Sequence, residues 1–331
     1  MERYRISRYC LKRRRKMGYI GIDIGGTQVK FGYVSQDGQV SNTIAFDVAF
    51  DGYETPIIVT VMEKLAWFMK EHNLTEENIQ GIGVSATGQI DVTIGQVIGS
   101  AGHIKNWEGC NIKEQIKTIY NGPVSVMNDA NCAALAEQWV GGAKGATDAI
   151  VVTIGTGVGG GIIVDSKILC GARGIGGEIG HIIIRNNGVK CSCGNRGCYE
   201  QYGSTTALVK AVKEAVENGD IPAELFEGKA INGRSIFENL SKNETLANIL
   251  DEWMNCIADG IISLVHTFNP QVVLLSGGVS AQKELFIDPL REKVLQRTMP
   301  ECARYLRVDA AEMGNNAGLV GAVYYCITNG N

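Results

Sequence analysis

Three short apolar stretches stand out along the chain, and each one runs into a glycine turn. The stretches cover residues 19–24, 149–154 and 272–275, and their turns are Gly25-Gly26-Thr27, Gly155-Thr156-Gly157 and Gly277-Gly278. Short apolar runs bounded by turn residues are typical of buried strands. β-branched residues return soon after the first two turns, at 29–34 and 162–164. The sequence therefore predicts two hairpins there, rather than a strand followed by a helix.

The second glycine turn has the spacing of a dinucleotide fingerprint but lacks its context. Gly155, Gly157 and Gly160 match G-x-G-x-x-G, yet that site needs a helix beginning at the turn, and Ile162-Ile163-Val164 favours a strand. A Walker A motif is also absent, since Gly228-Lys229 is followed by alanine. Two glycine hairpins remain, whose backbone N–H groups suit phosphate oxygens on opposite sides of a cleft. Either turn alone is equally well explained as an ordinary tight hairpin; their repetition favours the phosphate interpretation.

A fourth apolar run, residues 124–127, ends in Asn128-Asp129 and leads into an alanine-rich segment of helical character. Asp129 stands where a helix N-cap would, and capping is the simplest role for an Asp there. In open α/β sheets, however, ligands bind at the carboxyl ends of strands, where a carboxylate can accept a hydroxyl proton. Farther along, residues 206–250 are helix-forming with little recognisable chemistry, and Trp253, Met254 and Ile257 have the helical spacing of a core face.

Length and charge narrow the choice of class. A chain of 331 residues is long enough for two domains. The formal net charge of −4 is uneven, because residues 1–16 hold eight Lys or Arg and one Glu, a charge of +7 that leaves −11 elsewhere. An acidic body argues against a general nucleic-acid surface. The basic leader precedes no apolar segment of its own, so we expect a disordered tail, or a natural start at Met17, rather than an export signal. No window approaches a membrane span, and we expect a cytoplasmic protein with reduced cysteines.

Residues 178–200 concentrate the remaining chemistry. His181, Cys191, Cys193 and Cys198 offer one imidazole and three thiols, a set that suits tetrahedral zinc. Glu178 and Glu200 flank the quartet, and zinc's preference for nitrogen and sulfur leaves both carboxylates free to hold something polar. The plainer alternative is a structural zinc knuckle with two surface glutamates.

Taken together, these segments resemble the ROK family of sugar kinases and repressors, within the actin-like ATPase superfamily. The resemblance spans residues 18–325 and rests on Asp23-x-Gly-Gly-Thr27, Asn128-Asp129, the glycine turn 155–161, Gly176-Gly177-Glu178-Ile179-Gly180-His181 and Cys191-x-Cys193-Gly194-x-x-Gly197-Cys198-x-Glu200. It implies a two-domain α/β fold of the ribonuclease H-like type, with ATP and sugar in the interdomain cleft. We expect a tail at 1–16, a small domain at 17–120 completed by a C-terminal helix at 315–331, and a large domain at 121–314 carrying the zinc site.

The resemblance also implies an activity and its residues. A glucokinase-like enzyme would transfer the γ-phosphate of ATP to the C6 hydroxyl of a hexose, with Asp129 as catalytic base. The sugar contacts would be Gly88, Asn106, Asn128, Asp129, Glu178, His181 and Glu200. The contacts to ATP and Mg²⁺ would be Asp23, Gly25, Gly26, Thr27, Lys30, Thr156, Gly157, Gly277 and Gly278. Asp23 would hold Mg²⁺, and Gly277-Gly278 would lie under the adenosine. Structural zinc on His181, Cys191, Cys193 and Cys198 would fix the loop that carries Glu200, and the family suggests a homodimer.

Two departures from the family pattern keep the substrate open. Thr87-Gly88 replaces the usual Pro-Gly, and the segment before Trp107 offers either Asn106 or His103 as a sugar contact. N-acetylmannosamine and a β-glucoside therefore stand beside glucose as candidate substrates. Only 22 residues precede Asp23, too few for the helix-turn-helix of a ROK-type regulator. An actin-like ATPase that binds no sugar is the alternative from another class, and the Glu178–His181–Glu200 group argues against it.

Overall fold

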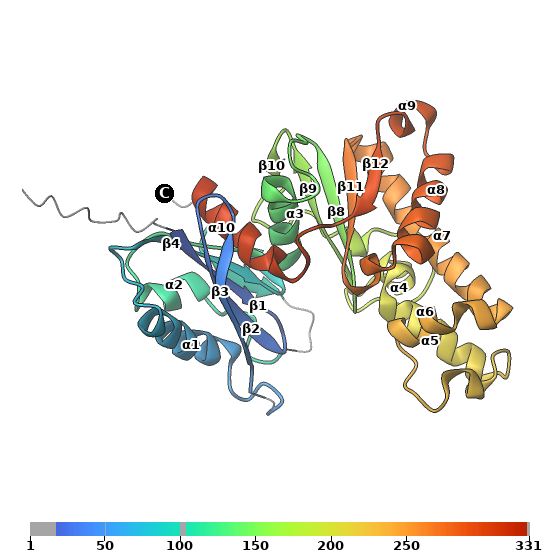
Figure 1. Ribbon diagram of the computed structural model, residues 1–331, viewed down its shortest axis with the longest axis horizontal. Coiled ribbons are helices and arrows are strands. Elements are labelled where there is room, and N and C mark those ends of the chain that lie inside the picture. Colours follow the sequence, from blue (N-terminus) through green and yellow to red (C-terminus); the bar gives the residue numbers. More distant parts are fainter. Residues whose placement is uncertain (1–17, 50, 100–103, 330–331) are drawn as a thin grey trace, which may run out of the picture.

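The computed structural model describes residues 18–49, 51–99 and 104–329. The expected tail at 1–16 and the candidate His103 lie outside these residues. Two five-stranded sheets stand on either side of a pair of central helices (Figure 1). Within the described residues, no helix is long and apolar enough to span a membrane.

The two sheets have the same strand order. The first runs β3-β2-β1-β4-β7 and the second β10-β9-β8-β11-β12. Their strands are β1 (Gly18–Ile24), β2 (Gln28–Val34), β3 (Val40–Asp47), β4 (Ile79–Ala86), β7 (Val124–Asn128), β8 (Ala149–Ile154), β9 (Val158–Val164), β10 (Lys167–Ile168), β11 (Val272–Ser276) and β12 (Arg307–Ala310). In each sheet the first three strands in the chain pair antiparallel and the last two add parallel. A separate small ribbon joins β5 (Gln89–Asp91) to β6 (Gln96–Gly99).

Both predicted hairpins are confirmed. In β1–β2, Asp23 lies opposite Lys30, and in β8–β9, Thr153 lies opposite Gly159. Asp23 and Thr153 are thus the last residue but one of their strands, immediately before the two glycine turns begin. The carboxyl ends of β1, β4 and β7 meet at one sheet edge because these strands are parallel.

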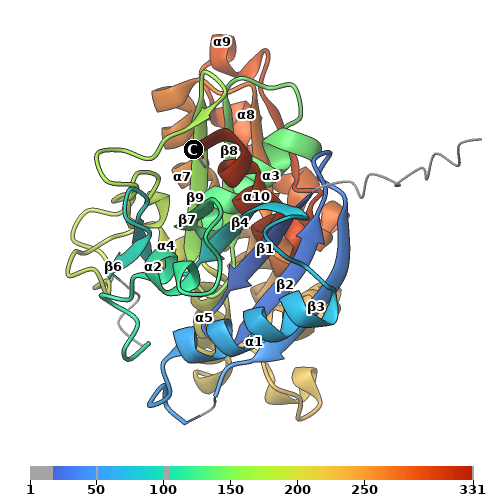
Figure 2. The ribbon, with the colours of Figure 1, turned by 90° about the vertical axis from the view of Figure 1, so that its left-hand side faces the viewer.

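The helices cover the sheets and cross between them. They are α1 (Ile57–Glu71), α2 (Ile112–Lys117), α3 (Asp129–Val140), α4 (Glu200–Gly203), α5 (Thr205–Glu217), α6 (Gly233–Asn239), α7 (Glu244–Phe268), α8 (Asp288–Arg297), α9 (Pro300–Ala303) and α10 (Ala317–Asn329). Figure 2 shows α1 across the first sheet, whereas α7 and α8 lie with the second. Trp253, Met254 and Ile257 of α7 are buried, as the spacing predicted.

The helices α3 and α10 each pack on the sheet opposite to the one that they follow in the chain. α3 follows β7 yet packs on β8 and β9, while α10 follows β12 and packs on β1 and β4. The two helices meet so closely at Gly321 that a Cβ there would lie 1.7 Å from the carbonyl oxygen of Cys132. We call residues 18–128 with α10 the first lobe, and residues 129–316 the second. The expected boundary at residue 120 is corrected by this pairing, because β7 hydrogen-bonds to β4 and extends the first sheet to Asn128.

Buried Glu137 links the segment that follows α3 to the segment that precedes α10. Its side chain, on the last turns of α3, is 1% exposed. Its carboxylate accepts the N–H groups of Gly142, Glu312 and Met313 at 2.8, 2.8 and 2.7 Å. Gly142 follows α3 and residues 312–313 precede α10, so one carboxylate satisfies donors from both connections between the lobes. A buried carboxylate is tolerated because three charge-assisted hydrogen bonds replace its hydration.

Candidate functional site

The carboxyl end of β7 presents Asn128 and Asp129 with different tasks. The N-cap of α3 is Asn128, not Asp129: its Oδ1 accepts the N–H of Ala130 at 3.0 Å and of Asn131 at 3.3 Å. Its Nδ2 donates to the Gly88 carbonyl at 2.9 Å, which ties the helix start to the loop after β4. Because the cap is already supplied by Asn128, the simplest explanation for Asp129 no longer applies. Asp129 is the first residue of the helix, with one oxygen on the Ala130 N–H at 2.8 Å.

The environment of Asp129 favours a proton acceptor near neutral pH. Desolvation by the surrounding protein, followed by the charge of Asp23, raises the pKa of Asp129 to about 6, although the residue is exposed. Desolvation also raises the pKa of Asp23, against the hydrogen bond from Ser85 Oγ at 2.7 Å and the charge of Lys30. Two neighbouring carboxylates whose pKa values are both raised are candidates for acid–base chemistry and for binding a cation.

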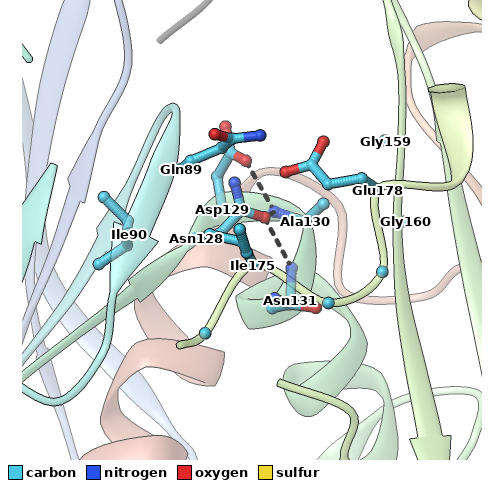
Figure 3. Close-up of a pocket in the computed structure, with 13 residues that line it drawn as sticks. Gln89, Ile90, Asn128, Asp129, Ala130, Asn131, Gly159, Gly160, Ile175 and Glu178 are labelled. Carbon is cyan, nitrogen blue, oxygen red and sulfur yellow. Dashed lines mark hydrogen bonds between the residues drawn. The ribbon is translucent and has the colours of Figure 1, made fainter. Parts of the chain in front are cut away.

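Asn128 and Asp129 open onto a cavity of about 70 Å³ between the lobes (Figure 3). Glu178 reaches it from the second lobe, and Gln89 and Ile90 reach it from β5 of the first. The remaining lining is Ala130, Asn131, Gly159, Gly160, Gly174, Ile175, Gly176 and Gly177. Figure 3 shows the Glu178 carboxylate and the Gln89 amide facing the space beside Asn128 and Asp129. Three of the predicted sugar contacts are therefore brought together here.

Sequence reasoning did not assign Gln89, Asn131 or Gly174 to the site, and it noted Gly176-Gly177 only as part of a family motif. Gln89 directly follows the unusual Thr87-Gly88 pair, a position that the departure from Pro-Gly could have marked. Gly174 and Gly177 have φ of +96° and +90°, a region that other residues seldom occupy. A Cβ on Gly174 would lie 2.6 Å from the Ile90 carbonyl, so glycine lets this turn of the second lobe touch β5 of the first.

Glu200 lies away from that cavity. Its Oε2 accepts the Val158 N–H at 3.1 Å, and a Cβ on Gly157 would lie 2.3 Å from the same oxygen. Glu200 instead lines a larger cavity of about 540 Å³ with Thr156, between α5 and α7. The predicted sugar carboxylates are thus divided in this state, with Glu178 at the small cavity and Glu200 against the second glycine turn.

The predicted metal ligands do converge. One donor atom from each of His181, Cys191, Cys193 and Cys198 lies within 4.8 Å of the others. Cys191 Sγ is 3.6 Å from His181 Nδ1, and Cys193 Sγ is 3.6 Å from Cys198 Sγ. A tetrahedral zinc ion with bonds of about 2.3 Å to sulfur separates its ligand sulfurs by about 3.8 Å, so the quartet fits such an ion. Burial opposes a thiolate at Cys191, but hydrogen bonds from Cys193, Cys198 and His181 outweigh it and lower the Cys191 pKa to about 7.

The glycine turns differ in what covers them. The first turn is approached from one side by Tyr53 Oη and Ile104 Cδ1, each 3.4 Å from where a Gly26 Cβ would stand. On the inner side, Asp23 lies against the start of α10, since a Cβ on Gly318 would come within 2.4 Å of its carboxylate. Thr27 and Thr156 are exposed, whereas Lys30 Nζ donates to the Asn315 carbonyl at 2.5 Å. Gly25 has only the Gln28 carbonyl within 4 Å of a Cβ position, at 3.4 Å.

The third turn joins the second hairpin. Gly277 has φ of +104°, and a Cβ there would lie 2.1 Å from the Ile154 carbonyl. Gly278 is open, with no atom of the described residues within 4 Å of a Cβ position. A flat group could therefore rest on Gly278, while Gly277 packs beneath it.

Asn106 contacts a neighbouring loop instead of the cavity. Its Nδ2 donates to the Tyr53 carbonyl at 3.2 Å, and the adjacent Lys105 pairs with Glu54 at 3.0 Å. Trp107 is buried and donates from Nε1 to the Thr87 carbonyl at 2.9 Å. This segment therefore supports the Thr87-Gly88 turn from behind.

Comparison with known proteins places these features in one family. The model of the ROK family matches residues 19–329. Among curated relatives, a glucokinase of Streptomyces coelicolor is 32% identical over 92% of this chain and 95% of its own. A β-glucoside kinase of Listeria innocua is 30% identical over 95% and 99%. A xylose repressor of Caldicellulosiruptor bescii is 29% identical over 94% of this chain but 78% of the repressor.

Solved structures agree in fold. A ROK family glucokinase from Streptomyces griseus, in complex with glucose and AMPPNP, superposes with a TM-score of 0.77 at 31% identity, over 92% of this chain and 98% of that one. A putative N-acetylmannosamine kinase from Listeria monocytogenes gives 0.78 at 27% identity, over 95% and 100%.

Proposed function

Because this chain belongs to the ROK family and has its two-domain, actin-like fold, as the sequence predicted, we propose that it is an ATP-dependent sugar kinase. One observation carries the proposal. Asp129, with a pKa of about 6, stands at the carboxyl end of β7 beside a small polar cavity that also holds Asn128 and Glu178. A base with this pKa is largely ionised at neutral pH and still accepts a proton readily.

The reaction we propose is phosphoryl transfer to the C6 hydroxyl of a hexose. The hydroxyl oxygen forms a bond to the γ-phosphorus as the bond from that phosphorus to ADP breaks, and the hydroxyl proton passes to the Asp129 carboxylate. Asn128 and Glu178 hold neighbouring hydroxyls, because amides and carboxylates pair with groups that both donate and accept. His181 and Glu200, on the same lobe as Glu178, would supply the remaining sugar contacts. Catalysis of this kind depends on positioning and on neutralising charge.

The glycine turns would hold ATP. Gly25, Gly26, Thr27, Thr156 and Gly157 supply backbone and hydroxyl donors to phosphate oxygens, with Lys30 nearby, and Gly277-Gly278 lie under the adenosine. Asp23 would hold Mg²⁺, directly or through water, and that ion would neutralise phosphate charge. The four zinc ligands would keep the 181–200 loop in shape, which sets the position of Glu200. Closure of the lobes would exclude water as a competing acceptor.

Glucose is our first choice of substrate, supported by the glucokinase relatives. N-acetylmannosamine and a β-glucoside remain as alternative substrates, since a putative N-acetylmannosamine kinase and a β-glucoside kinase are also similar to this chain. Gln89 is a further reason to retain these alternative substrates. Its amide lines the cavity next to the Thr87-Gly88 pair, where the sequence departs from the usual Pro-Gly. A pocket that hydrogen-bonds hydroxyls discriminates strongly against analogues that leave its polar groups unpaired.

ATP consumption with a sugar panel tests the proposal. Glucose, mannose, allose, fructose, N-acetylmannosamine, N-acetylglucosamine and cellobiose should differ in kcat/KM by orders of magnitude. Another sugar about a hundredfold better than glucose would replace glucose as the substrate. ATP turnover indifferent to every sugar would indicate the sugar-independent ATPase, and sugar binding without turnover would indicate a regulator. The homodimer stays a prediction, which light scattering during size-exclusion chromatography can check.

A further inference from the structure

Asn131 combines deep burial with an unused hydrogen-bonding atom at the cavity. It lies on the first turn of α3, and its backbone N–H is taken by the Asn128 cap. The residue is 2% exposed, yet its Oδ1 has no hydrogen-bond partner among the residues that the structure describes. An unpaired buried acceptor is unfavourable by about 1–3 kcal/mol, so such an atom is expected to gain a partner in some functional state.

The glycine turn 176–178 lies directly over this atom. A Cβ placed on Gly177 would be 3.5 Å from Asn131 Oδ1 and 3.3 Å from the Gly160 carbonyl. Gly177 has φ of +90°, so its backbone can approach the amide without a side chain between them. The contact therefore sets the backbone at Gly177 against α3, the helix that begins with Asp129, within the second lobe.

This turn also has unused donors. Gly176 N–H donates to the Cys170 carbonyl at 2.8 Å, and Ile179 N–H donates to the Gly177 carbonyl at 2.7 Å. Between them, the N–H groups of Gly177 and Glu178 meet no acceptor anywhere in the part of the chain that the structure describes. An acceptor and two donors without partners thus lie in neighbouring segments, on α3 and on the adjacent glycine turn.

We propose that Asn131 is the positioning residue of Glu178: when sugar binds, Asn131 Oδ1 accepts a backbone N–H from the Gly177–Glu178 turn and fixes the Glu178 carboxylate over the cavity. Sugar hydroxyls held by Asn128 and Asp129 at the start of α3 and by Glu178 on the turn draw the two segments together. The new hydrogen bond then relieves the unpaired acceptor only in the sugar-bound state. This inference rests on the proposed sugar-kinase function and adds to it how the second lobe's carboxylate is placed.

The chain contains a matched control. Gln138 lies on the same helix, is 8% exposed and also has an unpartnered buried oxygen, Oε1. It does not line the cavity. Asn131→Leu and Gln138→Leu each remove an unpaired amide and keep a side chain of similar size. Removing such a group can leave stability unchanged or raise it.

The test measures sugar binding apart from turnover. In Asn131→Leu we expect the sugar KM to rise about tenfold or more, with the KM for ATP and the melting temperature of the sugar-free protein preserved. Hydrogen exchange at the Gly177 and Glu178 amides should slow on adding sugar to the native protein and not to this variant. Gln138→Leu should behave as the native protein in both measurements. Asn131→Ala repeats the test if leucine disturbs the helix.

Three outcomes would overturn the inference. One is a native sugar KM in Asn131→Leu; a second is equal slowing of the two amides by sugar in this variant. The third is a fall in melting temperature that accounts for the lost sugar affinity, with additive effects when Glu178→Gln is combined, since residues that act through one another give non-additive changes. If the native protein shows neither sugar-dependent turnover nor a sugar-induced thermal shift, the proposed function fails first, and this inference with it.

Discussion

The two lobes share one arrangement of strands and helices but carry different side chains at equivalent positions. Each has a five-stranded sheet in the same order, a hairpin with a glycine turn, and a final helix that crosses to the other lobe. At equivalent points before the turns, the first hairpin has Asp23 and the second has Thr153. The first hairpin thus brings its own carboxylate, whereas the second is contacted by Glu200 from a distant segment.

The last strands of the two sheets, β7 and β12, also end in different residues. β7 ends at Asn128, which is followed by Asp129, and its counterpart β12 ends at Ala310, which is followed by Ala311. The long segment between β10 and β11 of the second lobe supplies the metal quartet, Glu178 and Glu200. The shared strand order therefore positions the site, and the residues that differ between the lobes are those we propose as acid–base and binding groups.

The largest effect is expected from removing the carboxylate at the β7 crossing. Asp129→Asn should lower kcat by roughly 10²–10⁴-fold while sugar still raises the melting temperature, because the amide keeps the shape but cannot take the hydroxyl proton. Steady-state kinetics and a sugar thermal-shift series measure both. Glu312→Gln, beyond the β12 end, is the control. A native kcat in Asp129→Asn would remove the proposed base.

The next prediction compares substitutions at the equivalent positions of the two hairpins, Asp23 and Thr153. Asp23→Asn should lower kcat/KM for ATP on the order of 10²-fold and raise the Mg²⁺ concentration needed for half-maximal rate, since a preorganised charge near the phosphates is lost. Thr153→Val removes a buried hydroxyl without a partner and should leave both values near native. Equal losses in the two variants would show that the hairpins are not specialised as we propose. Mg²⁺ titrations separate the cases.

The pH profile sharpens the same contrast. Asp129 must be ionised to accept a proton, so kcat/KM should fall about tenfold per unit below a pH of about 6. The charge of Asp23 helps to raise that pKa, and Asp23→Asn should therefore move the acid limb to lower pH, while Thr153→Val should not move it. An acid limb that begins near pH 4 in the native protein would contradict this assignment.

A smaller effect should follow from removing one of the four candidate zinc ligands of the second lobe. Cys193→Ala should reduce bound zinc from about one per chain to nearly none, lower the melting temperature by roughly 5 °C or more, and weaken sugar binding along with it. Elemental analysis and thermal denaturation provide readouts independent of activity. Cys110→Ala, outside the quartet, is the matched control. Metal-free native protein with full stability and sugar affinity would refute the zinc site.

The smallest effect concerns neighbouring glycines of the third turn. Gly278→Ala should keep the native melting temperature, because nothing lies within 4 Å of the added methyl group, and should raise the KM for ATP a few-fold, by about 1 kcal/mol or less. Gly277→Ala should instead destabilise the fold, since its Cβ would meet the Ile154 carbonyl at a φ of +104°. If Gly278→Ala leaves the KM for ATP unchanged, the adenosine does not rest there.

What the sequence determined by itself is local. The two hairpins, the helix after Asn128, the core face of α7 and the four candidate metal ligands all follow from short-range periodicity and spacing, which depend on the backbone and on neighbours in the chain. The tertiary structure decided which distant segments meet. It made Asn128 the cap in place of Asp129, joined β7 to the first sheet, set Glu200 on Gly157, and brought Gln89 and Asn131 to the cavity. Those contacts depend on how two lobes pack through α3 and α10, and no spacing along one segment encodes that packing.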